Sequence, residues 1–192
     1  MGEIARRLVH ASGTGFPLLY LLDERYALGL GGWRTLQALL VAGAAVALAL
    51  EALRLTGRVD WAVYDRLTRD YEDDNLAGYA LYMLAMAATA LLFEPTPAVP
   101  ALLMLTVADP VAGLLSAGNV VKQGWVLLAT FGVCVLLATP FVPPLAAVAG
   151  GAVAAVADGY KPVVRTHVVD DNITIPLGAA TAMWLVLTYA PA

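Results

Sequence analysis

The chain has 192 residues, of which 60% are hydrophobic and 14% are charged, and its mean hydropathy is +0.76. A soluble domain carries about 25% charged residues, so most of this surface must face something other than water. The length leaves no room for a separate soluble enzyme beside the membrane part, and the net charge of −4 indicates little about partners.

The apolar runs predict an all-α, polytopic membrane protein, a single transmembrane domain over residues 1–192. Because each crossing needs roughly 20 apolar residues, we expect about seven transmembrane helices. They span residues 8–22, 36–55, 76–93, 97–119, 124–140, 143–157 and 173–190. The uncharged run 123–157 is too long for one crossing, and Pro140, Pro143 and Pro144 divide it into two helices. The second of these two helices is rich in Ala and Gly, which suits close contact with other helices.

The distribution of positive charge predicts the orientation. With the N-terminus in the cytoplasm, nine basic residues fall on the cytoplasmic side: Arg6, Arg7, Arg54, Arg58, Arg66, Arg69, Lys122, Lys161 and Arg165. Only Arg25 and Arg34 fall outside, which is the bias that the positive-inside rule describes. We therefore expect a multi-pass protein of the cell membrane with its N-terminus inside and its C-terminus outside. The loop 54–75 has mixed charge and two aromatic residues, so we expect an amphipathic helix on the cytoplasmic surface.

Asp109 is the first candidate for chemistry, because it lies inside the fourth apolar segment. A carboxylate at membrane depth costs about 2.5–3.5 kcal/mol on insertion scales. Pro110 removes a helical N–H group, and Gly113 and Gly118 leave the backbone open to close approach. These features predict a broken helix that lines a polar cavity. The alternative is a carboxylate paired with a neighbouring arginine for structural reasons.

A second candidate group lies between the last two expected helices. Within 15 residues the chain places two cations, three carboxylates, an amide and an imidazole: Asp158, Lys161, Arg165, His167, Asp170, Asp171 and Asn172. Fixed cations suit phosphate groups, and adjacent carboxylates suit a hard metal ion such as Mg²⁺. The alternative is helix capping, because Asp-Asp-Asn before an apolar run is typical of a helix N-terminus. The same triplet occurs at residues 73–75, where capping is the favoured interpretation.

The third group is Arg6, Arg7 and His10, near the start of the chain. The arginines could serve only as topology signals, and His10 could be a membrane histidine with a structural partner. The sequence has no Walker, Rossmann or nucleophile-elbow pattern and no zinc-binding spacing.

These groups, in this order, resemble the polyprenol kinase family, which includes dolichol kinase, phytol kinase and the CTP-dependent diacylglycerol kinase. The family is itself similar to the phosphatidate cytidylyltransferases. The residues that carry the resemblance are Glu3, Arg6, Arg7 and His10, then Asp109, Ala112 and Gly113, and finally Asp171-Asn172-Ile173-Thr174-Ile175-Pro176-Leu177. The stretch 71–79 also looks like the family. The resemblance covers nearly the whole chain and looks closest to archaeal members.

The resemblance implies that a phosphoryl group passes from CTP to the hydroxyl of a lipid alcohol, polyprenol-like or diacylglycerol-like, with Mg²⁺ or Mn²⁺ as cofactor. Asp109 and Asp171 would be the catalytic and metal-binding residues. The nucleotide would be bound by Arg6, Arg7, Gly113, Lys122, Lys161, Arg165 and Asn172. Further candidates are His10, Asp158 and Asp170. Ser116 stands where the family often has glycine, and 122–124 is a reduced form of a longer family block, which leaves open whether CTP or ATP is the donor.

Two alternatives to a lipid kinase stay open. A cytidylyltransferase that forms a CDP-lipid could use the same charges, and an ion-coupled transporter could use Asp109 on a broken helix as its coupling site. In each case we expect a site that faces the cytoplasm, the bilayer as a partner and no nucleic acid. The identity of the lipid and the oligomeric state stay open.

Overall fold

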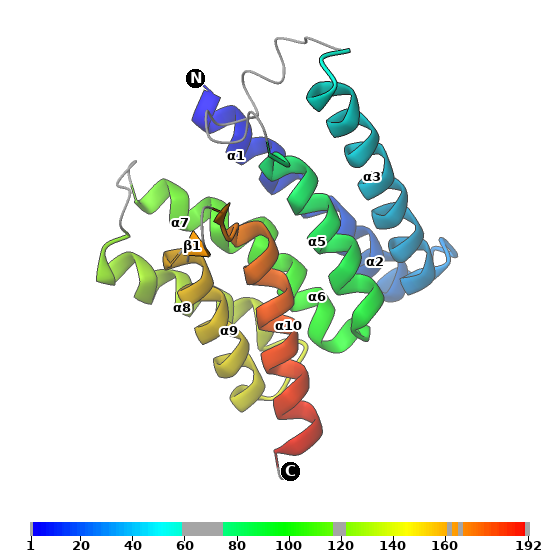
Figure 1. The fold of residues 1–192 in the computed structure, drawn as a ribbon. Helices are drawn as coiled ribbons and strands as arrows, with labels where there is room; N and C mark the ends of the chain where they lie inside the picture. The colour runs from blue at the N-terminus through cyan, green and yellow to red at the C-terminus, as the bar shows by residue number, and fades with distance from the viewer. Residues whose placement is uncertain (1, 59–74, 117–121, 161–162, 165–166, 191–192) are drawn as a thin grey trace.

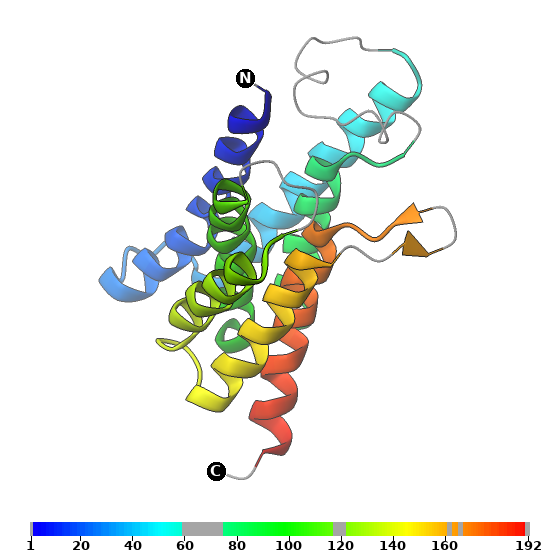
Figure 2. The same ribbon diagram turned by 90° about the vertical axis from the view of Figure 1, so that its left-hand side faces the viewer.

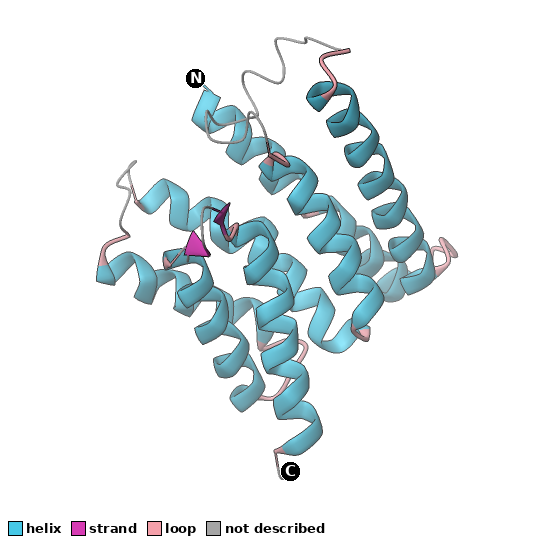
Figure 3. Ribbon diagram, in the orientation of Figure 1, coloured by secondary structure: helices cyan, strands magenta, loops and turns pink. Residues whose placement is uncertain are grey.

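The computed structural model describes residues 2–58, 75–116, 122–160, 163–164 and 167–190 (Figure 1). Among these residues the chain is helical apart from one small hairpin, as Figure 3 shows. The helices are α1 (Gly2–Ser12), α2 (Gly15–Tyr26), α3 (Gly32–Leu55), α5 (Gly78–Leu92), α6 (Pro95–Leu103), the π-helix η2 (Met104–Ala108), α7 (Asp109–Leu115), α8 (Gly124–Ala138), α9 (Pro144–Gly159) and α10 (Asp171–Tyr189). The strands β1 (Val163–Val164) and β2 (His167–Val168) pair antiparallel between α9 and α10.

In the described part of the chain, three helical stretches are long and apolar enough to cross a membrane. They are α3, the continuous stretch Pro95–Leu115 that contains α6, η2 and α7, and α10. Three shorter helices, α5, α8 and α9, are also apolar. The prediction of a helical membrane protein is confirmed at this level, while the number of crossings and their direction stay predictions.

The helix expected over residues 8–22 is divided into α1 and α2 by a turn at Gly13 and Thr14. The turn brings the chain against α5, where the hydroxyl of Tyr82 donates a hydrogen bond to the carbonyl of His10 at 2.8 Å. A Cβ atom on Gly13 would lie 1.7 Å from that hydroxyl, so the close approach requires glycine. The break depends on a residue some 70 positions away, and the apolar run alone does not reveal it.

The helix expected over residues 97–119 is interrupted before Asp109 by the π-helical turn η2. The backbone N–H of Asp109 donates to the carbonyl of Met104, one residue beyond the α-helical partner. Because Pro110 has no N–H, the carbonyls four and five residues before it lose their helical donors. Side chains from the start of the chain replace them, since His10 Nε2 lies 3.0 Å from the Leu105 carbonyl and Thr14 donates to the Thr106 carbonyl at 3.4 Å. The predicted break at Asp109 is therefore a π-helical turn. Its free carbonyls are bound by His10 of α1 and by Thr14 of the turn after α1.

Helix α9 packs between α8 and α10 with very little space. An added Cβ on Gly150 would meet Met183 of α10 at 2.6 Å, and one on Gly151 would meet the side chain of Val135 of α8 at 2.8 Å. The expected role of this small-residue helix in tight helix contact is confirmed. Its end brings Asp158 close to α7 and α10.

The two termini lie at opposite ends of the bundle (Figure 1). The end of α3, the start of α5, the end of α7 and the hairpin lie toward the end that carries the N-terminus. The connections from α2 to α3, from α5 to α6 and from α8 to α9 lie toward the other end, with the C-terminus. The hairpin extends sideways from the bundle (Figure 2). The expected amphipathic helix of the 54–75 loop falls mostly on residues 59–74, which lie outside the described residues.

Candidate functional site

Three carboxylates from three different helices meet at the N-terminal end of the bundle. Asp109 is the first residue of α7, Asp158 is the second-last residue of α9, and Asp171 is the first residue of α10. Each offers one oxygen, and these three oxygens lie within 4.8 Å of one another. Asp158 and Asp171 are buried, and Asp109 is half-buried. The sequence predicted that Asp109 and Asp171 act together, and the structure brings them together with Asp158, which had been only a further candidate.

Asp171 points into this aspartate cluster because its neighbour takes over the capping of α10. The carboxylate of Asp170 accepts hydrogen bonds from the backbone N–H of Asn172 at 2.9 Å and from its amide nitrogen at 2.6 Å. The amide nitrogen of Asn172 also donates to the carbonyl of Gly78 at 3.4 Å, which ties α10 to the start of α5. The capping interpretation therefore holds for Asp170, and it leaves Asp171 at the cluster.

Lys122, which precedes α8, forms an ion pair with Oδ1 of Asp158. Only 1% of the Asp158 side chain and 14% of the Lys122 side chain are exposed. The other oxygen, Oδ2 of Asp158, is buried without a hydrogen-bond partner among the described residues. The sequence suggested Lys122 as a phosphate ligand; in the structure its ammonium group already neutralises part of the cluster.

The side chain of Arg7 lies against α7 at Gly113, four residues after Asp109. A Cβ atom added to Gly113 would come within 2.8 Å of a terminal guanidinium nitrogen of Arg7. Glycine at this position therefore leaves the space that the arginine occupies. Of the other predicted phosphate ligands, Arg6 is in α1 but its side chain lies outside the described residues, as do the side chains of Lys161 and Arg165.

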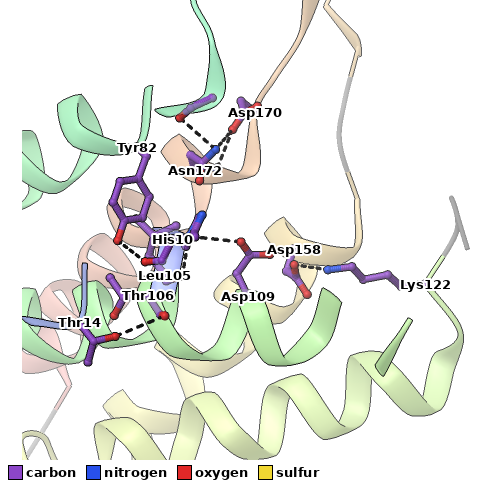
Figure 4. A network of polar contacts seen from close by, with 11 residues as sticks. His10, Thr14, Tyr82, Leu105, Thr106, Asp109, Lys122, Asp158, Asp170 and Asn172 are labelled. Atoms are coloured by element: carbon purple, nitrogen blue, oxygen red, sulfur yellow. Dashed lines mark hydrogen bonds and ion pairs between the residues drawn. The ribbon is translucent and has the colours of Figure 1, made fainter. Parts of the chain in front are cut away.

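His10 connects the π-helical turn to the cluster (Figure 4). Its Nε2 atom is 3.0 Å from the Leu105 carbonyl and 3.4 Å from Oδ2 of Asp109. Both neighbours are acceptors, so Nε2 carries a proton and His10 donates. The ring also packs edge-to-face on Tyr82, with centroids 4.3 Å apart. Tyr82 was not among the predicted site residues, and a hydroxyl on the buried face of an apolar helix would have been the only signal for it.

The aspartate cluster fits a hard divalent cation. Mg²⁺ and Mn²⁺ bind through carboxylate, carbonyl and water oxygens, and all three aspartates offer carboxylate oxygens at one point. A buried carboxylate oxygen without a partner is costly, and a bound cation would remove that cost at Oδ2 of Asp158. Asn172 adds another buried oxygen, Oδ1, that has no partner among the described residues.

The arrangement can bind a cation and, beside it, an anion. Lys122 pairs with Asp158 and Arg7 lies against Gly113 of α7, and both side chains can neutralise phosphate oxygens. His10 fixes one carboxylate oxygen of Asp109, so the orientation of that side chain is set before any substrate arrives. Comparison of the chain with known protein families, with curated proteins and with solved structures gave no match.

Proposed function

We propose that the protein is a membrane phosphotransferase that uses a divalent cation to move a phosphoryl group from CTP to the hydroxyl of a lipid alcohol, polyprenol-like or diacylglycerol-like. The observation that carries this proposal is the meeting of three carboxylates with a lysine at one end of an apolar helical bundle. Phosphoryl transfer depends on charge neutralisation and in-line positioning more than on covalent chemistry. A membrane boundary is also where a lipid hydroxyl and a soluble nucleotide can meet.

The resemblance to the polyprenol kinase family adds support, because the residues that carry it lie side by side although they are far apart in sequence. His10 is 3.4 Å from Asp109, and Asp109 is within 4.8 Å of Asp171. Arg7 lies against Gly113. A chance similarity of short motifs would give no reason for them to converge.

Each side chain has a role in this proposal. The carboxylates of Asp109, Asp158 and Asp171 would hold the cation, whose charge offsets that of the triphosphate. Lys122 and Arg7 would neutralise phosphate oxygens, and the resemblance implies that Arg6, Lys161, Arg165 and Asn172 also take part in nucleotide binding. Asp109 or Asp171 accepts the proton of the lipid hydroxyl, and His10 holds Asp109 in place for that step.

The placement in the membrane is part of the proposal. We infer seven crossings, the first of them over residues 8–22, with a cytoplasmic N-terminus and an external C-terminus. Support comes from the termini at opposite ends of the bundle (Figure 1), and from the positive charges of Lys122 beside Asp158 and of Arg7 against α7. A reporter fused after Ala192 should report the outside, and one inserted in the 56–70 loop should report the cytoplasm. Both reporters on one side would contradict this map.

The activity is tested with purified protein, labelled CTP or ATP and a total lipid extract. A kinase labels a lipid from the γ-phosphate and releases CDP, whereas a cytidylyltransferase labels it from the cytidine and releases pyrophosphate. Asp109→Asn protein is the control for contaminating enzymes. Label in no lipid from either nucleotide would contradict phosphoryl transfer and favour a transporter.

A further inference from the structure

The two oxygens of the Asp158 carboxylate have different surroundings. Its Oδ1 is paired with Lys122, while Oδ2 is buried and has no hydrogen-bond partner in the described ranges. Lys122 lies on the far side of Asp158 from Asp109 (Figure 4). One oxygen of this carboxylate therefore already has a cation, and the other is left without a partner among the described residues.

Two cations on one buried carboxylate repel each other, so they compete for it. A lysine ammonium is a compact charge on a flexible four-carbon stem, which lets it leave an ion pair without any change in the backbone. Asp158 has no such freedom, because it sits near the end of α9, where Gly159 packs against Leu127 and an added Cβ would meet that side chain at 2.2 Å. If one member of the pair moves, it is the lysine.

We propose that Asp158 is the third ligand of the divalent cation and that Lys122 is its internal counter-ion. Lys122 pairs with Asp158 when the cation is absent and gives way when the cation binds, which frees its ammonium for a phosphate group. This inference rests on the proposed function for the presence of a divalent cation, but it concerns binding and not turnover. It predicts that Lys122 opposes binding of the metal, the reverse of what a residue that builds the site would do.

The test is titration of the purified protein in detergent with Mn²⁺, without nucleotide or lipid, following free Mn²⁺ by electron paramagnetic resonance. Lys122→Met should bind Mn²⁺ at least about fivefold more tightly than the wild type, the lower end of typical coupling between two sites. Lys122→Arg, which keeps the charge, should stay close to the wild type. Asp158→Asn should bind about tenfold or more weakly, since even residues behind the ligands cost that much. Asp23→Asn, a carboxylate change at the other end of the bundle, is the matched control and should not alter the affinity.

A melting curve with and without Mn²⁺ covers the case in which Lys122→Met folds poorly. Loss of the lysine leaves Asp158 uncompensated, so the variant should melt lower than the wild type without metal and recover when Mn²⁺ is added. Unchanged or weaker Mn²⁺ binding by Lys122→Met, or no recovery, would overturn the counter-ion role. Wild-type affinity in Asp158→Asn, or no Mn²⁺ binding by the wild type, would overturn the ligand role.

The two proposals can fail separately. Labelled lipid with an Asp158→Asn protein that binds Mn²⁺ normally would leave the phosphotransferase intact and remove this inference. The expected Mn²⁺ pattern without labelled lipid would do the opposite.

Discussion

Buried carboxylates occur at two places toward the same end of this bundle, in the Glu51 group (Glu51 with its partners) and in the aspartate cluster, and their charges are balanced in different ways. Glu51, near the end of α3, is 1% exposed. Its Oε1 accepts from Arg54 at 2.6 Å and from the backbone N–H of Ala77 at 2.8 Å, while its Oε2 accepts from Arg54 Nε at 3.1 Å and from the hydroxyl of Tyr79. Arg54 also donates to the carbonyl of Asn75. The protein itself supplies every partner that Glu51 needs.

The aspartate cluster has the opposite character. Three carboxylates meet within 4.8 Å, and Oδ2 of Asp158 has no hydrogen-bond partner in the part of the chain that the structure describes. Burial of like charges side by side is costly, so this arrangement makes sense when a cation belongs there. A carboxylate that is fully satisfied by its own protein joins elements, here α3 to α5. Under the proposed function, the aspartate cluster is instead completed by a bound cation.

The largest effect that separates the two groups should come from removal of metal. If the aspartate cluster works through Mg²⁺ or Mn²⁺, excess EDTA should abolish transfer of label to lipid, and a zinc-selective chelator should not. The Glu51 group needs no cation, so EDTA should not break the bonds between α3 and α5 that this group makes. Activity and melting temperature measured on the same samples test this, and full turnover in excess EDTA would remove the metal from the mechanism.

Replacing single carboxylates is the next test. Asp109→Asn should insert and fold normally, because a buried amide costs less than a buried carboxylate. Its activity should fall by about two orders of magnitude or more, as expected for loss of proton acceptance or of a metal ligand, and Asp171→Asn should behave likewise.

The control for these two variants is Asp74→Asn, outside the described residues, which should be nearly silent because Asn caps a helix as well as Asp. A stable and fully active Asp109→Asn protein would contradict the proposed role of Asp109 in the reaction. An Asp109→Asn that loses stability and activity together would instead indicate a structural ion pair, whose breakage costs about 3–5 kcal/mol.

Glu51→Gln should give the converse result, a loss of stability. The amide presents N–H groups to donors and leaves the Arg54 guanidinium without its charge partner, so we expect the free energy of unfolding to fall by about 3 kcal/mol. Glu24→Gln, at an exposed position, is the matched control and should change stability by less than about 0.5 kcal/mol. Melting curves in detergent would decide, and a Glu51→Gln protein as stable as the wild type would remove the structural role.

These two groups also show how far the sequence can be interpreted. Asp109 stood out because a carboxylate and a proline interrupt an apolar run. That local signal predicted the break in the helix, and it made Asp109 a candidate site residue. The helices themselves followed from the length of the apolar runs, to within a few residues at most ends.

What the sequence could not reveal depends on contacts between distant elements. The spacing of Glu51 and Arg54, three residues apart, is compatible with an ion pair on one helix, but the bonds from Glu51 to Ala77 and Tyr79 cannot be inferred from that spacing. The pairing of Lys122 with Asp158 joins two segments 36 residues apart. Asp158 was recognisable as a polar residue near a membrane boundary, but its place in the cluster depends on the packing of α9 against α8 and α10.

A smaller effect is expected at the edge of the cluster. In Gly113→Ala the new Cβ would displace the Arg7 guanidinium, which lies 2.8 Å away. We expect the KM for the nucleotide to rise about tenfold, as for one weakened charge-assisted hydrogen bond. Stability should not fall, because alanine favours the helix over glycine by about 1 kcal/mol. Gly132→Ala, where an added Cβ meets nothing within 4 Å, is the control and should leave the KM unchanged. A lower melting temperature with an unchanged KM would contradict a role for Arg7 in nucleotide binding.

The smallest effect should come from another acidic residue, Asp23, just beyond the predicted crossing 8–22. Like Glu51 it is satisfied by the protein itself, since the backbone N–H groups of Leu30 and Gly32 donate to its carboxylate at 2.9 and 2.7 Å. These bonds hold the pKa of Asp23 below its ordinary value. A depressed pKa contributes stability at pH values above the unfolded-state pKa of about 3.9, and the contribution is lost as the pH falls through the folded-state pKa.

Asp23→Asn should therefore melt slightly below the wild type at neutral pH, and the melting temperatures of the two proteins should converge as the pH drops below about 4. The turn from α2 to α3 lies at the end of the bundle away from the aspartate cluster (Figure 1), so the variant should keep its activity. A melting difference that stays constant from pH 7 to pH 3 would show that the charge of Asp23 does not matter to the turn.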